Sequence, residues 1–200
     1  MRPYLPYILL LSTALATPGN SSKVLADSGY DQTLKKALNT LKEQQQEYDE
    51  RYSRVLYNIG VAYYGMGDFT NQERYCVKSL EIEKNLYGES SPLIIKTCNL
   101  LAISYLGLQE YTKSLEYSKT ALNIAGNNPA SVDITDLKAI YNNLGVTYIH
   151  LSDYSKAKVY LEKTESFYLF KHFLRDDNYI ALLNNMAITY GFLGLSEKSK

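Results

Sequence analysis

The sequence predicts an all-α protein, a right-handed α-solenoid of stacked antiparallel helix hairpins. An eight-residue pattern containing a small residue, with a Tyr three positions later, recurs around Gly60, Ala102, Gly145 and Ala187 at spacings of 42, 43 and 42 residues. In the first copy the apolar positions Leu56, Ile59 and Tyr63 follow i, i+3 and i+7, which is one face of a helix. Such a hairpin cannot bury its apolar face alone, so neighbouring hairpins must stack. A four-helix bundle would need no identical pattern at a fixed spacing.

The second half of each unit also repeats. A short turn around Gly67 leads to Asp68, and the same position holds Asp153 two units later. An Asp there can accept a backbone N–H and cap the second helix. We expect this helix to end near Gly88, and Pro92 to open the next hairpin.

The first residues are typical of a targeting segment. Arg2 precedes an apolar run over residues 7–16, and small residues allow cleavage after Ala16 or after Ala26. The run is much shorter than the roughly 20 residues that span a bilayer. Residues 1–26 are therefore predicted to be a signal peptide with a short linker. The mature chain is expected outside the cytoplasm: periplasmic, in the cell envelope or secreted.

The rest of the chain divides by the repeat. Ala37-Leu38 lies 42 residues before Ser79-Leu80, so residues 30–52 are predicted to form an N-terminal capping helix. About three and a half repeats follow over residues 53–200, with the ranges 53–94, 95–137, 138–179 and 180–200 and the last one incomplete. A first helix without its partner helix would be marginal in water, so we expect possible self-association through this uncapped helix.

These residues resemble the tetratricopeptide repeat (TPR) family, in the long form of about 42 residues found in kinesin light chains. The resemblance is carried by Ile59-Gly60, Tyr63, Gly67-Asp68-Phe69 and Ser79-Leu80, and it covers nearly all of the mature chain. Gln72 and Ser114 depart from it, because the family prefers Ala at that position. The resemblance implies a non-catalytic scaffold that binds a protein or an extended peptide. The alternative is a truncated sensory or interaction region of a larger signalling protein, such as a histidine kinase, or of a CHAT-type protein.

In that family the first helices line the concave surface, which gives the candidate peptide-binding residues. The polar candidates are Asn58, Asn99, Asn142, Asn143, Asn184 and Asn185, and the aliphatic candidates are Val61, Ile103, Val146 and Ile188. An Asn amide both donates and accepts hydrogen bonds, so a row of them could hold a peptide backbone of any sequence. Alternatively, the Asn side chains bond between neighbouring helices and only set the curvature.

Composition and motifs argue against other classes of function. The 21 basic and 21 acidic residues give a formal net charge of zero, so no basic surface for nucleic acid is predicted. The sequence holds no phosphate loop, HExxH, paired CxxC or GxSxG pattern, so we expect no enzyme, cofactor or metal site. Cys76 and Cys98 could form a disulfide after export, or remain two buried thiols, which we favour.

Overall fold

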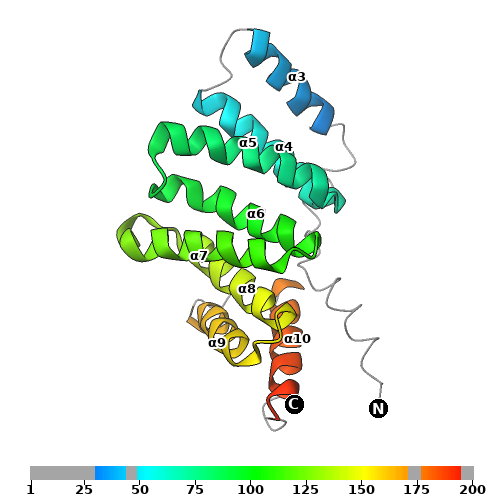
Figure 1. Ribbon diagram of the computed structural model, residues 1–200, viewed down its shortest axis with the longest axis vertical. Helices are drawn as coiled ribbons and strands as arrows, with labels where there is room; N and C mark the ends of the chain where they lie inside the picture. The colour runs from blue at the N-terminus through cyan, green and yellow to red at the C-terminus, as the bar shows by residue number, and fades with distance from the viewer. Residues whose placement is uncertain (1–29, 44–48, 171–176, 195–200) are drawn as a thin grey trace. The chain divides into compact units, whose positions relative to one another are not determined.

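The computed structural model describes residues 30–43, 49–170 and 177–194, and these contain helices and no strands. The predicted signal peptide, with both cleavage positions, lies outside the described residues. The helices are α3 (Tyr30–Glu43), α4 (Glu50–Met66), α5 (Phe69–Tyr87), α6 (Ile95–Gly107), α7 (Tyr111–Asn127), α8 (Ile134–His150), α9 (Tyr154–Phe170) and α10 (Asp177–Phe192), with short 3₁₀ helices η1 (Pro92–Ile94) and η2 (Pro129–Ser131) (Figure 1).

The chain forms two compact units. The first, Pro18–Asp136, holds α3 to α7, and the second, which includes Leu137–Lys200, holds most of α8 with α9 and α10. In the first unit α3 packs on α4, α4 pairs with α5, α5 packs on α6, and α6 pairs with α7. In the second unit α9 contacts α10. The predicted repeat start at 95 is the first residue of α6, whereas those at 53, 138 and 180 fall inside α4, α8 and α10.

Side-chain caps start the second helices where the sequence predicted them. The Asp68 carboxylate accepts the backbone N–H of Asn71 at 3.0 Å, and the Asp153 carboxylate accepts that of Lys156 at 3.1 Å. Pro92 opens a short 3₁₀ helix before α6, since it begins η1, and Pro129 begins η2 in the same way before α8. Gly88 follows α5 with a φ of 86°, which a glycine adopts without strain.

The backbone after each first helix takes the same left-handed conformation in all four copies. Four residues after each recurring Tyr the backbone is left-handed, with φ of 72° at Gly67, 62° at Gln109, 59° at Ser152 and 69° at Gly194. In the first three copies the next backbone N–H bonds back to the Tyr carbonyl, at 3.0, 2.8 and 2.9 Å. This bond closes the first helix and reverses the chain.

The small residues allow close packing inside each hairpin, as predicted. A Cβ added at Gly145 would lie 2.6 Å from Cδ2 of Leu161 in α9, and one added at Gly60 would overlap the sulfur of Cys76 in α5. Ala102 is fully buried, and Ala187 is half-buried. The recurring Tyr packs beside this contact, because Tyr63 stacks on Tyr75, Tyr105 on Tyr117 and Tyr148 on Tyr160, with ring centroids 5.4–5.7 Å apart.

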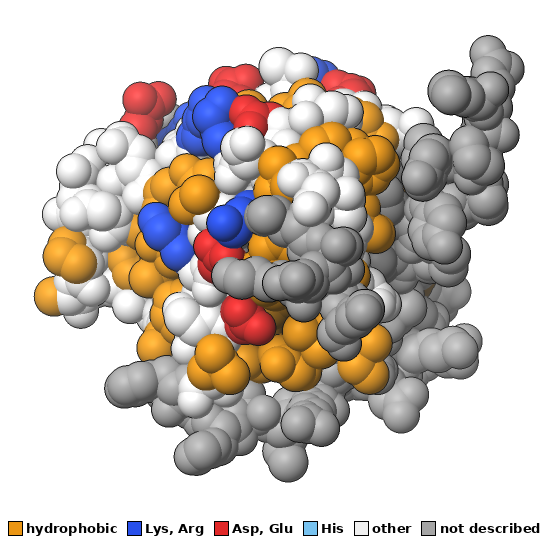
Figure 2. Space-filling view, turned by 90° about the horizontal axis from the view of Figure 1, so that it is seen from below, with side chains coloured by type: hydrophobic (Ala, Val, Ile, Leu, Met, Phe, Trp, Pro, Cys, Tyr) orange, Lys and Arg blue, Asp and Glu red, His pale blue; other side chains and the backbone are white. Residues whose placement is uncertain are grey.

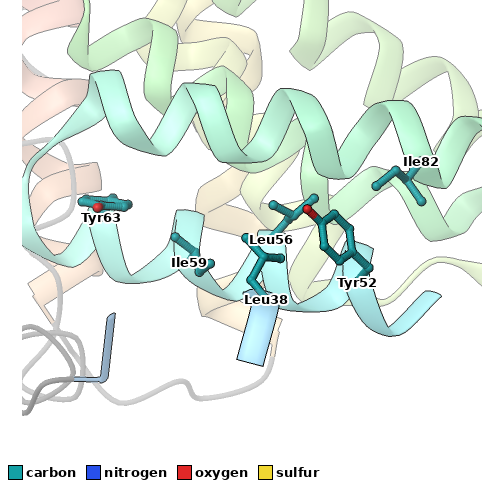
Figure 3. Close-up of a cluster of buried hydrophobic side chains, with 6 residues drawn as sticks. All are labelled: Leu38, Tyr52, Leu56, Ile59, Tyr63 and Ile82. Carbon is teal, nitrogen blue, oxygen red and sulfur yellow. The ribbon is translucent and has the colours of Figure 1, made fainter. Parts of the chain in front are cut away.

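The N-terminal helix α3 covers the first hairpin. Leu38 of α3 belongs to a buried cluster with Tyr52, Leu56, Ile59 and Tyr63 of α4 and Ile82 of α5 (Figure 3). Leu38 is 8% exposed, and burying a Leu side chain contributes roughly 1.5–3 kcal/mol. The Lys35 ammonium also donates to the Tyr63 hydroxyl at 2.6 Å. A helix therefore lies where the sequence predicted the cap, although α4 already begins at Glu50.

Candidate functional site

One face of α4 and α6 combines accessible polar and aliphatic side chains. We call it the first-helix face, and it consists of Arg54, Tyr57, Asn58 and Val61 on α4 and Lys96 and Ile103 on α6. Arg54 and Lys96 are exposed, and Asn58, Val61 and Ile103 are half-buried. The neighbouring stripe of α4, formed by Ser53, Leu56 and Gly60, is buried in the hairpin. The helix period therefore separates the packing surface from the accessible one.

The stacking of hairpins decides which positions stay accessible. The Leu100 side chain of α6 lies 3.5 Å from the place of a Cβ on Gly60 of α4, so this position packs back onto the preceding hairpin. Its register equivalents in the later copies are Asn143 and Asn185, which are 4% and 2% exposed. These two amides therefore occupy a packing position.

The structure divides the predicted peptide-binding residues into two groups. The accessible group contains five half-buried residues, Asn58, Asn142, Val61, Ile103 and Ile188, and the exposed Asn184. The buried group contains Asn99 at 5% exposure, Asn143 and Val146 at 4%, and Asn185 at 2%. The buried four cannot touch a peptide unless the helices move. This corrects the expectation that every member of the row lies on the surface. Asn143 and Asn185 occupy the position at which Leu100 packs on the preceding hairpin. Asn99 and Val146 are buried although residues at the same register in other copies keep accessible surface, so the surroundings of each helix decide the exposure.

The sequence reasoning did not select two residues of this region, Asp136 and Tyr57. The Asn99 amide donates to the backbone carbonyl of Asp136 at 3.4 Å. Burial raises the pKa of Tyr57 to about 12, and the carboxylates of Asp136 and Glu83 add to the effect. Tyr57 therefore keeps its hydroxyl proton and can donate it at neutral pH. The candidates were selected because they are Asn residues. Selecting them by their distance from the recurring small residue would have found Tyr57, which lies three residues before Gly60, as Asn99 lies three residues before Ala102.

A buried carboxylate lies on the other side of α4. Glu83 of α5 accepts hydrogen bonds from the hydroxyls of Ser53 and Ser79, both at 3.1 Å, and the two hydroxyls are 3.2 Å apart. Burial raises the pKa of Glu83, and hydrogen bonds from Thr97 and from the two Ser hydroxyls partly oppose the shift. This cluster lies inside the α4–α5 hairpin, so it belongs to the packing and not to the first-helix face.

The cysteines are free thiols, so the structure does not contain the alternative disulfide between Cys76 and Cys98. Both are fully buried. Burial raises the pKa of Cys98 to about 12, and it raises that of Cys76 further. Both sulfurs therefore stay protonated and behave as small apolar groups.

Across the part of the chain that the structure describes, no group of three or more His, Cys, Asp and Glu side chains is placed to hold a metal ion. His150 is half-buried, and burial lowers its pKa. His172 lies outside the described residues. No described helix has the length and hydropathy needed to cross a membrane.

Comparison with known proteins decides the family. Two models described as tetratricopeptide repeat match residues 51–127 and 139–164, which together make up more than half of the chain. The chain belongs to the tetratricopeptide repeat family. No curated protein matches it.

Solved TPR structures have the same fold. The nearly identical TPR-like repeats of a Podosopora anserina kinesin light chain superpose with a TM-score of 0.67 at 13% identity, covering 95% of this chain and 90% of that one. BtubC (BKLC) from P. vanneervenii gives a TM-score of 0.64 at 17% identity, with 99% and 87% covered. The predicted all-α, TPR-like fold is therefore confirmed. TPR repeats are typical of protein-interaction scaffolds, and such scaffolds are generally non-catalytic.

Proposed function

We propose that this TPR protein binds a protein or an extended peptide on its first-helix face, without catalysis and outside the cytoplasm. One observation carries the binding proposal. Side chains at matching positions of α4 and α6, such as Val61 and Ile103, keep accessible surface, whereas the stripe beside them is buried. A surface that combines apolar and hydrogen-bonding groups on α4 and α6 suits a ligand with its own repeating backbone.

The chemistry of the face fits an extended main chain. Asn58 offers both a donor and an acceptor to peptide groups, and Tyr57 offers a protonated hydroxyl. Val61 and Ile103 lie one turn further along their helices and can contact alternate side chains of the peptide. In the second unit Asn142 and Asn184 occupy the register position of Tyr57, Ile188 occupies that of Val61, and all three keep accessible surface.

A random peptide library displayed on phage, selected on the full chain, tests the proposal. Peptides that are enriched would be synthesised with a fluorophore and titrated by anisotropy. A lost hydrogen bond of about 0.5–1.5 kcal/mol corresponds to weakening by roughly 2- to 13-fold. We expect this loss for Asn58→Ala in the first unit or for Asn184→Ala in the second.

The matched control is Asn85→Ala, which removes an exposed amide from the second helix α5. We expect it to leave the affinity unchanged. Equal affinity of all three variants, or a loss only for Asn85→Ala, would overturn the assignment of the binding face. Helicity measured by circular dichroism should be the same for each protein.

The proposed export rests on the apolar run behind Arg2. Mass spectrometry of the protein from its native source should find a mature N-terminus at Thr17 or Asp27 in an extracytoplasmic fraction. A chain that still begins at Met1 and stays with cytoplasmic markers would overturn it.

A further inference from the structure

Helix α10 exposes a stripe that is buried in the first helices α4 and α6. In α4 the residues 7 and 4 positions before the recurring small residue are Ser53 and Leu56, the small residue itself is Gly60, and α5 covers them. In α6 the same positions are Ile95, Cys98 and Ala102, with at most 1% exposure. In α10 they are Ile180, at 54% exposure, Leu183, at 41%, and the half-buried Ala187.

One side of α10 is well packed, so the open stripe does not reflect a loose helix. Leu182, Met186 and Thr189 are at most 6% exposed, and α10 contacts α9. The Phe192 ring stacks on Tyr154 with centroids 4.3 Å apart. Figure 2 shows one surface of the molecule, turned by 90° from Figure 1, on which hydrophobic side chains lie among a few charged ones. The stripe itself carries no charge.

Helix α3 has the position of a second helix, and no first helix is paired with it among the described residues. Helix α10 is a first helix, and no second helix is paired with it among the described residues. It packs on α4 as α5 packs on α6. Its Thr33 and Ala37 take the register positions of Tyr75 and Ser79, which face the first helix α4 of their own hairpin. Thr33 is exposed and Ala37 is half-buried.

The two helices match in polarity at the positions that would meet. In the α4–α5 hairpin the contact of Ser53 with Ser79 and Glu83 is polar. The register equivalents of Ser53 and Ser79 are Ile180 in α10 and Ala37 in α3. Both positions are polar in the α4–α5 hairpin and apolar in α10 and α3, so these two helices would meet through apolar side chains.

We propose that α10 of one copy accepts α3 of a second copy and forms a composite hairpin between them. The sequence predicted self-association through the uncapped helix, and the structure provides its complementary surface. The contact joins two different surfaces, so each added copy leaves an α10 and an α3 free and a head-to-tail assembly can grow. This proposal is independent of peptide binding on the first-helix face, because the stripe lies on another side of the first helix.

Cysteine cross-linking tests the geometry. The Ser53 and Ser79 hydroxyls are 3.2 Å apart, so side chains at the equivalent positions 180 and 37 would lie within reach of a disulfide. Ile180→Cys and Ala37→Cys chains, mixed and oxidised, should give a heterodimer on a non-reducing gel. The native thiols are buried and should stay unreactive. The control pairs Ile180→Cys with Asn39→Cys, an exposed position elsewhere on α3, and should cross-link at least tenfold less.

Equal cross-linking of the control pair, or dominant dimers of Ile180→Cys alone, would overturn the proposal, since the latter would indicate pairing of α10 with α10.

Light scattering of mixed variants tests the head-to-tail order. The molar mass of the wild-type chain should rise with concentration, whereas Leu183→Glu and Ala37→Glu should each stay monomeric. Their mixture should give a 1:1 dimer and nothing larger, because one variant keeps an intact α3 and the other an intact α10. Leu93→Glu, at a 62% exposed position in η1, is the control and should behave as wild type. A wild-type chain that stays monomeric throughout, or dimers of Ala37→Glu alone, would refute the inference.

Discussion

The close contact between α8 and α9 makes Gly145→Ala a sensitive probe of the hairpin. The added Cβ would lie 2.6 Å from Cδ2 and 2.8 Å from Cγ of Leu161, and 3.5 Å from the backbone N of that residue. Carbon atoms in contact prefer about 3.5–4.0 Å, so the overlap is close to 1 Å. Leu161 is fully buried and cannot swing into solvent. Overpacking costs roughly 1–3 kcal/mol, and replacing Gly by Ala in a helix gains up to about 1 kcal/mol. We expect Gly145→Ala to lower the free energy of unfolding by about 1 kcal/mol.

Urea denaturation followed by circular dichroism measures this loss as a lower midpoint. The control is Gly126→Ala in α7, where an added Cβ meets nothing within 4 Å and should raise the midpoint. In a Leu161→Ala background, which itself costs roughly 2–5 kcal/mol, the Gly145→Ala change should become stabilising because its methyl group fills vacated space. The reasoning fails if the two glycine substitutions shift the midpoint in the same direction, or if the Leu161→Ala background leaves the effect unchanged.

Three further predictions follow from the buried polar groups, the thiols and the caps. Glu83→Gln should stabilise the fold at neutral pH, because the raised pKa of Glu83 means that its ionised form is disfavoured in the folded state. That penalty is complete above the folded pKa and disappears as the pH falls through it, so denaturation midpoints of the two proteins should converge in acid; a constant difference would contradict this. Cys76 and Cys98 should react with a thiol reagent only on unfolding, and rapid reaction of the native protein would show that the reagent reaches these thiols in the folded state. Asp68→Ala should cost about 1 kcal/mol through loss of the α5 cap, whereas Asp68→Asn should cost much less; equal losses would argue against capping.

The local signals of the repeat were readable from the sequence. The cap at Asp68 and the small residues at Gly60 and Gly145 were predicted, because an N-cap and a 3.6-residue period involve residues close together in the chain. Helix α3 was predicted in the same way, from Ala37-Leu38 at one repeat length before Ser79-Leu80. Repetition strengthened each of these signals, since one pattern appeared four times.

Only the tertiary structure decided which side chains of the first helices can meet a partner. Asn58 keeps accessible surface, whereas Asn143 and Asn185 are buried at the position where Leu100 packs on Gly60 of the preceding hairpin. The contact of Ser53 with Glu83 joins residues 30 positions apart and leaves no periodic mark in the sequence. The sequence determines that a helix forms and which stripe of it is apolar. Accessibility depends on where neighbouring helices lie around that stripe, and a rotation of about 100° per residue moves the next side chain from the buried side to the open one.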